Sequence, residues 1–251
     1  MHVNMVFYEM FTWDHVIAAI ICVFAPIMAF TARQISSEDI KLEPQDKIRL
    51  YHSNSLLLIV FALIVTTTWR FPHRTLIALG LDWPVWHPYV FIFLFFIFLF
   101  YVLDIFFQYG TRKRREKTYQ QRHKIFSFIP TDKNELTHFA FLALAAGISE
   151  EIIFRGYLVH YMVFWTGGTT NGIISACLFS SALFAFLHGY QGVSSMAKIF
   201  FIALMFCGVF IFSHSLVIVI IVHALIDILS GLVGVYHVKD MGPETEGERE
   251  S

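Results

Sequence analysis

The chain has 251 residues, of which 57% are hydrophobic and only 15% are charged, and its formal net charge is −1 at pH 7. Soluble domains carry about 25% charged residues. The composition therefore excludes a disordered chain, a collagen and a disulfide scaffold, argues against a soluble enzyme, and provides no overall basic field for nucleic acid. The three cysteines, Cys22, Cys177 and Cys207, lie in apolar runs and are expected to be free thiols.

Seven apolar runs follow one another along the chain, although several are shorter than the roughly 20 residues that cross a bilayer as a helix. The sequence therefore predicts an all-α fold, a polytopic transmembrane helix bundle of about seven spans. An eighth element could lie at 76–86, where Trp83 and Trp86 suit the membrane interface. Pro26 is expected to kink the first span. The predicted spans are 15–30, 55–69, 89–107, 139–164, 173–187, 196–212 and 215–235.

Lysine and arginine residues are concentrated on one side of the predicted bundle. The other side holds only Arg70 and Arg74, and Arg155 lies within a span, so the remaining fifteen of the 18 share one side. Because such residues are retained in the cytoplasm, we expect the N-terminus outside and the C-terminus inside. We expect an integral protein of a prokaryotic cytoplasmic membrane. The basic block at 111–117 could contact nucleic acid, but we interpret it as a contact with anionic lipid.

Charged residues inside predicted spans are the strongest indication of function. Each one costs at least about 2.5–3.5 kcal/mol on insertion scales, so it needs a compensating role. In the fourth span, Glu151 and Arg155 are four residues apart and are predicted to pair on one helix face. Glu150 points about 100° away from Glu151 on a regular α-helix. Its carboxylate can therefore stay outside that pair and face a cavity.

The other polar groups belong to two later spans. His223 and Asp227 are four residues apart and form one polar stripe on an apolar helix, and His188 ends the fifth span before Gly189, a typical helix C-cap residue. At 1.5 Å per residue, Glu150 is expected about 16 Å from the cytoplasmic helix ends, Asp227 about 12 Å and His223 about 18 Å. These depths predict that the groups converge in the cytoplasmic half or the middle of the bilayer.

Several chemistries are compatible with such a cluster. A carboxylate near two imidazoles can hold and deprotonate a water, and a second histidine can stabilise an oxyanion. Intramembrane Glu, Asp and His can also form a proton relay, and buried polar residues can simply hold helices together. We favour peptide hydrolysis because the polar residues lie on three spans at matching depth. A Zn²⁺ site is the other hydrolytic arrangement, with the ligand types present in Glu150, His188, His223 and Asp227.

Three motifs at these positions resemble the CAAX prenyl endopeptidase and bacteriocin-processing family, the CPBP or Abi proteins, which are intramembrane proteases. The family pattern is EExxxR, FxxxH, then HxxxN or HxxxD, and it is matched in order at 150–155, 184–188 and 223–227. The resemblance covers about residues 136–235, and the first three spans match only in general character. We divide the chain into N-terminal spans with a basic cytoplasmic loop at 1–135, a CPBP-type catalytic core at 136–238, and a disordered polar tail at 239–251.

The resemblance implies a role for each polar residue. Glu150 would be the general base that activates water, helped by His188. His223 and Asp227 would occupy the oxyanion or second-ligand positions of the family. The first motif also contains Glu151 and Arg155. This pair would be structural or would orient the substrate.

The resemblance leaves the need for a metal undecided, because the family has been described both as metal-dependent and as using glutamate without metal. Asp227 stands where Asn is common, and an ionised Asp cannot donate a hydrogen bond to an oxyanion. Asp227 would therefore have to be protonated, orient His223, or bind a metal. We favour glutamate-type chemistry with no cofactor over a divalent metal such as zinc.

The sequence thus predicts an intramembrane endopeptidase that hydrolyses a peptide bond in a membrane-associated peptide or a lipidated protein tail. Its expected partners are that substrate and the lipid bilayer, with no nucleic acid. The alternative is a catalytically idle bacteriocin-immunity or scaffold membrane protein that sequesters a peptide. The endopeptidase hypothesis requires Glu150 for function, whereas the alternative hypothesis does not.

Overall fold

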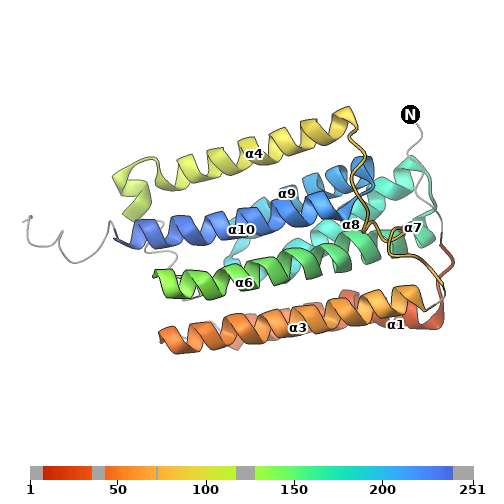
Figure 1. The fold of residues 1–251 in the computed structure, drawn as a ribbon, viewed down its shortest axis with the longest axis horizontal. Helices are drawn as coiled ribbons and strands as arrows, with labels where there is room; N and C mark the ends of the chain where they lie inside the picture. The colour runs from red at the N-terminus through yellow and green to blue at the C-terminus, as the bar shows by residue number, and fades with distance from the viewer. Residues whose placement is uncertain (1–7, 36–42, 72, 117–127, 240–251) are drawn as a thin grey trace, which may run out of the picture.

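A computed structural model of the protein describes residues 8–35, 43–71, 73–116 and 128–239. Within these parts the chain forms helices and connecting turns without any strand (Figure 1). Seven of the described helical segments are long and apolar enough to cross a membrane, which confirms the predicted polytopic all-α bundle. Of the predicted tail at 239–251 only Lys239 is described, as the last residue of a helix. The division into 1–135 and 136–238 stays a prediction.

The first span contains three segments with different hydrogen bonding. Helix α1 (Thr12–Ala19) passes into a π-helical segment, η1 (Ile20–Phe24), and then into α2 (Ala25–Ile35). Pro26 lies in the first turn of α2. Its ring lacks an N–H and crowds the carbonyl four residues earlier, and the wider turn directly before it makes room for the ring. A π-helical turn thus precedes Pro26, and the kink expected there stays a prediction.

The segment between α3 (Pro44–Arg70) and α4 (Pro88–Tyr109) is not helical in its described part, so the possible eighth element at 76–86 is not a span. It forms turns that lie against the start of the last helix, with the amide of Leu216 donating to the carbonyl of Gly80 at 2.7 Å. Gly80 has a φ of 101°, which a residue with a side chain rarely adopts. The apolar, Trp-rich segment therefore forms turns and not a helix.

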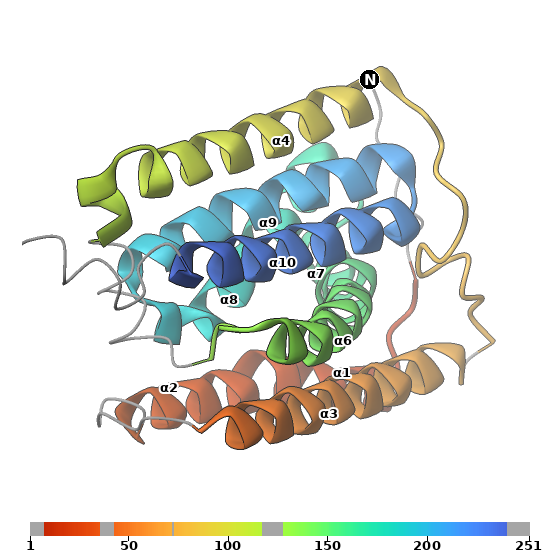
Figure 2. The ribbon, with the colours of Figure 1, turned by 60° about the vertical axis from the view of Figure 1, so that its left-hand side comes forward.

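The helices of the C-terminal half form the centre of the bundle. Figures 1 and 2 show α6 and α10 running side by side, α3 against α6, and α4 against α9. We call the end of the bundle where α4 ends and α6 begins the basic end, because the basic residues of 112–115 follow α4. The elements are α6 (Lys133–Glu150), η2 (Glu151–Leu158), α7 (Val159–Thr166), α8 (Thr170–Leu187), η3 (Gly189–Gln191), α9 (Val193–Ser213) and α10 (Leu216–Lys239).

Close approach of α6 to α10 is possible because small residues meet between them. A Cβ atom on Gly147 would lie 3.1 Å from both the Cβ and the backbone nitrogen of Ala224, tighter than an ordinary contact. Small residues at helix contacts let membrane helices pack by their backbones. Gly147 precedes the two glutamates of the first motif by one turn, and Ala224 follows His223. This contact therefore brings the first and third motifs together.

Buried ion pairs connect the N-terminal helices to the rest of the bundle. Arg74 pairs with Asp14 at 2.7 Å, with both side chains buried, and its guanidinium lies 4.3 Å from the ring centroid of Trp69. At the basic end, Lys47 of α3 pairs with Glu135 of α6 at 3.2 Å. Arg74, one of the two basic residues predicted on the outer side, is therefore engaged in an ion pair within the fold. All three cysteines are free, as predicted.

Candidate active site

The two glutamates of the first motif lie where the fourth span changes its hydrogen bonding. Helix α6 ends at Glu150, and η2, a π-helical segment, begins at Glu151; every residue of η2 is buried. Such π-turns are rare and are frequently found at functional sites. The hydroxyl of Ser180 on α8 donates to the carbonyl of Phe154 at 3.0 Å, which satisfies a carbonyl inside this segment. The sequence analysis assumed a regular α-helix, and no residue type in the run signals the π-turn.

Glu151 and Arg155 form a buried ion pair, as their spacing predicted. Nη1 of Arg155 donates to Oε1 of Glu151 at 2.8 Å, and both side chains are almost completely inaccessible. The guanidinium carbon lies 4.5 Å from the ring centroid of Phe184 and 5.4 Å from that of Phe206. A cation over aromatic rings is favoured when water is excluded. This packing joins the fourth span to α8 and α9.

His223 is held by the same carboxylate, a contact that the sequence analysis missed. Nδ1 of His223 lies 2.7 Å from Oε1 of Glu151. A carboxylate that pairs with Arg155 is ionised and can only accept hydrogen bonds, so Nδ1 of His223 carries a hydrogen. Glu151 therefore fixes which way the imidazole ring faces. The other ring nitrogen of His223, Nε2, points to the remaining carboxylates of the cluster.

Glu150 and Asp227 lie on either side of that nitrogen. Oε2 of Glu150 and Oδ2 of Asp227 are each 3.6 Å from Nε2 of His223. A bare lone pair on Nε2 facing two ionised carboxylates would be repelled by both. The arrangement is therefore most stable with one proton shared among the three groups, either on Nε2 or on one of the carboxyls. Asp227 is placed to support a charged imidazolium and to orient it.

His188 approaches the cluster from the end of α8. Nδ1 of His188 lies 2.8 Å from the carbonyl of Phe184, which can only accept, so Nδ1 carries the hydrogen and Nε2 has the lone pair in the neutral ring. The ring of Phe184 lies 4.5 Å from that of His188 and 6.2 Å from that of His223, centroid to centroid. The two imidazoles therefore lie around one phenyl ring. Among the described residues, no direct hydrogen bond joins His188 to Glu150.

The cluster is most open on the side of Asp227. The exposed fraction of the side chain is 0% for Glu151, 10% for His223, 14% for Glu150 and 36% for Asp227. Asp227 follows His223 by one turn along α10, toward the basic end. The cluster is therefore more accessible toward that end. The three motifs converge through contacts between helices, as the predicted depths required.

The donor atoms of the cluster include the ligand types of a zinc site, and the need for a metal stays a prediction. In the described parts of the chain, no group of three or more His, Cys, Asp or Glu side chains is arranged to hold one. Nδ1 of His223 is occupied by Glu151, and the carboxylates of Glu150 and Asp227 face Nε2. Oε2 of Glu150 and Oδ2 of Asp227 are each 3.6 Å from Nε2 of His223, so these three donors surround one point. The reaction proposed below uses protein groups and water.

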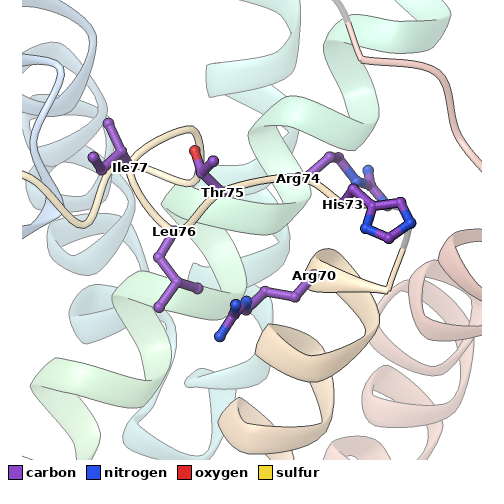
Figure 3. Close-up of a pocket in the computed structure, with 6 residues that line it drawn as sticks. All are labelled: Arg70, His73, Arg74, Thr75, Leu76 and Ile77. Atoms are coloured by element: carbon purple, nitrogen blue, oxygen red, sulfur yellow. The ribbon is translucent and has the colours of Figure 1, made fainter.

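A separate cavity lies at the opposite end of the bundle. Its volume is about 420 Å³, and Figure 3 shows its lining at the end of α3 and in the segment that follows. Its lining contains none of the residues of the three motifs. The cavity is therefore separate from the candidate active site. Its lining residues are Arg70, His73, Arg74, Thr75, Leu76 and Ile77.

The fold and the cluster define a helical membrane protein with a carboxylate–imidazole site between its spans. Residues 132–229, less than half of the chain, match the family model described as type II CAAX prenyl endopeptidase Rce1-like. This match confirms the family that the three motifs predicted, and it contains all of the predicted site residues. The chain is thus an integral membrane protein in which residues 132–229 are similar to the Rce1-like endopeptidase family. Nothing among the curated proteins or the solved structures matches the chain.

Proposed function

We propose that the protein is an intramembrane endopeptidase that hydrolyses a peptide bond in a membrane-associated peptide or lipidated protein tail. The observation that carries the proposal is the position of Glu150, partly exposed and 3.6 Å from Nε2 of His223, inside the segment that matches an endopeptidase family. A carboxylate in this position can accept a proton from water. We further propose that the basic end of the bundle faces the cytoplasm of a prokaryotic cell.

In the proposed reaction, Glu150 takes a proton from a water molecule, and the oxygen of that water attacks the scissile carbonyl carbon. The lone pair on Nε2 of His188 helps to orient the water. Nε2 of His223, carrying the shared proton, donates a hydrogen bond to the oxyanion that forms. Asp227 stabilises the charge of this imidazolium. Collapse of the intermediate breaks the C–N bond, and the proton held by Glu150 passes to the leaving amine.

Glu151 and Arg155 support this reaction without touching the reacting atoms. Glu151 accepts from Nδ1 of His223 and thereby keeps Nε2 directed into the cluster. Arg155 keeps Glu151 ionised and in place. Groups that orient a catalytic imidazole in this manner preserve its tautomer and its geometry.

The test compares membrane peptide termini in cells that carry the wild-type protein with those in cells that carry Glu150→Gln, at matched protein levels. The wild type is expected to produce termini that disappear in the variant, because glutamine cannot accept the proton of the water. The matched control is Glu116→Gln, which changes a half-buried glutamate that pairs with Arg112. Identical termini in all three strains, with the host phenotype intact, would favour an idle immunity or scaffold protein.

A chelator series on the same cleavage addresses the metal. Incubation of the purified protein with a strong zinc chelator is expected to leave the cleavage rate unchanged within about twofold, since protein groups supply both the base and the oxyanion donor. Catalytic zinc, by contrast, generates the nucleophile itself, so its removal abolishes turnover. Loss of activity that added Zn²⁺ restores would show that the glutamate-only mechanism is wrong.

A further inference from the structure

Glu150 and Glu151 are neighbours in the chain, and yet both of their carboxylates contact the ring of His223. Oε1 of Glu151 lies 2.7 Å from Nδ1, and Oε2 of Glu150 lies 3.6 Å from Nε2. Consecutive side chains on a regular α-helix diverge by about 100°, which is why the sequence analysis expected Glu150 to stay apart from the contacts of Glu151. The convergence of the two carboxylates coincides with the change of backbone at Glu151, where α6 passes into η2.

A hydrogen bond from another helix supports this change of backbone. The carbonyl of Phe154 accepts from the amide of Val159, five residues later, which is the interval that distinguishes a π-helix from an α-helix. The same carbonyl accepts from the hydroxyl of Ser180 on α8 at 3.0 Å. A carbonyl oxygen has two lone pairs, so it accommodates both donors. The side chain of Ser180 is completely buried, so water does not compete for its hydroxyl.

The π-helical turn also connects two sets of contacts that lie on different helices. Directly before and at its start, the two glutamates contact His223 on α10. Within it, Nη2 of Arg155 donates to the carbonyl of Ala203 on α9 at 3.4 Å, and the guanidinium lies 5.4 Å from the ring centroid of Phe206. Conversion of the turn to α-helix would change the register by one residue and rotate the helix before it by about 100° relative to the helix after it. The contacts on α9 and on α10 would then not be kept together.

The hydroxyl of Ser180 differs in its partner from another hydroxyl on the same helix. Serine side chains in helices commonly bond to a carbonyl of their own helix, four residues earlier. Ser175 does so on α8, where its hydroxyl donates to the carbonyl of Asn171 at 2.9 Å. Ser180 instead reaches the neighbouring span and meets the π-helical turn. It is therefore placed to favour that turn over a regular α-helix.

We propose that Ser180 is a positioning residue of the active site, which holds the π-helical turn beside which the two glutamates reach opposite nitrogens of His223. Ser180 acts through the carbonyl of Phe154 on the backbone that carries these carboxylates, and not by contact with the reacting atoms. The inference rests on the proposed function, because it assigns Ser180 a role in the rate of that hydrolysis.

The first experiment measures kcat and KM of the full-length protein in lipid vesicles, with the substrate identified by the comparison of membrane peptide termini. Ser180→Ala is expected to lower kcat by about 10–100-fold, because a small displacement of a catalytic group costs up to about 10²-fold. KM is expected to stay within about twofold, since the variant alters the catalytic geometry and no contact with the bound substrate.

The matched control is Ser181→Ala. Ser181 is the next residue on α8 and is equally buried, but its hydroxyl lies 3.6 Å from the thiol of Cys207 on α9. This variant removes a buried hydroxyl that does not meet the π-helical turn. Both kinetic constants are expected to stay within about twofold of the wild type.

Two replacements of equal size separate the hydroxyl of Ser180 from the packing around it. Threonine and valine have nearly the same shape, and only threonine can donate to the carbonyl of Phe154. Ser180→Thr is expected to have a kcat about tenfold higher than Ser180→Val. Because both variants add the same bulk at a buried position, overpacking affects them equally and cancels from the ratio.

A measurement without substrate reports on the same geometry. In protein labelled with ¹⁵N-histidine, the hydrogen on Nδ1 of His223 is expected to give a downfield proton resonance, because it is bonded to the carboxylate of Glu151. Its loss in Glu151→Gln identifies the resonance. Ser180→Ala and Ser180→Val are expected to shift or weaken it, and Ser181→Ala is expected to leave it in place.

Equal kcat values for Ser180→Thr and Ser180→Val, or an unchanged resonance of His223 in Ser180→Ala, would overturn the inference. So would equal losses of kcat in Ser180→Ala and Ser181→Ala, the result expected if either change simply loosened α8. Absence of Glu150-dependent cleavage by the wild type would remove the proposed function. The resonance would still decide whether Ser180 sets the geometry of His223, so the two failures are distinguishable.

Discussion

Glu150→Gln is expected to lower kcat/KM of the purified protein by about 10²–10⁴-fold, the contribution typical of a positioned general base. Glutamine has nearly the shape of glutamate but does not accept a proton from water at neutral pH. The carboxylate of Glu150 also lies 3.6 Å from Nε2 of His223, the same distance as the carboxylate of Asp227. The measurement is the cleavage rate of a defined substrate by wild type and variant in the same vesicles.

The variant must also be shown to fold. Glu150 is partly exposed and its nearest charged partner is 3.6 Å away, so the midpoint of unfolding is expected to stay close to that of the wild type. Glu116→Gln serves again as the matched control for a glutamate outside the three motifs. A Glu150→Gln protein that folds normally and keeps more than about a tenth of the wild-type rate would contradict the role of Glu150 as base.

Arg155→Met is expected to destabilise the folded protein by about 3–5 kcal/mol, because it leaves the carboxylate of Glu151 buried and without its cation. Both partners are almost wholly inaccessible in the native structure. Methionine preserves much of the apolar contact with Phe184 and Phe206. The loss of stability therefore reports mainly on the missing positive charge. The measurement is the free energy of unfolding in mixed micelles.

Two comparisons make the Arg155 experiment specific. The exposed pair Arg112–Glu116 provides the control, and Arg112→Met is expected to cost about 0–1 kcal/mol. The double variant Glu151→Gln with Arg155→Met is expected to be more stable than Arg155→Met alone, since no buried charge remains. An Arg155→Met variant that is no less stable than the Arg112→Met control would contradict a tightly coupled buried pair.

The motif spacing correctly predicted part of the site because it depends on local helix geometry. Residues four apart share a helix face, so the pairing of Glu151 with Arg155 follows from the chain alone. The convergence of the fourth and last spans also followed from counting residues along straight helices. The second acceptor role of Glu151, toward His223, was missed because it joins residues 72 positions apart. The ion pair of Asp104 with Lys198 was missed for the same reason, since its partners lie on different helices.

Apolar length and composition alone determined that the chain forms a polytopic helical bundle, because a bilayer about 30 Å thick requires long runs of residues that satisfy their own backbone hydrogen bonds. The three motifs alone indicated the family whose model matches residues 132–229. Only the tertiary structure decided that 76–86 forms turns, that the fourth span becomes π-helical at Glu151, and that Nε2 of His223 faces two carboxylates. These features depend on how helices pack against one another, and packing contacts between distant residues leave no periodic signal in a single sequence.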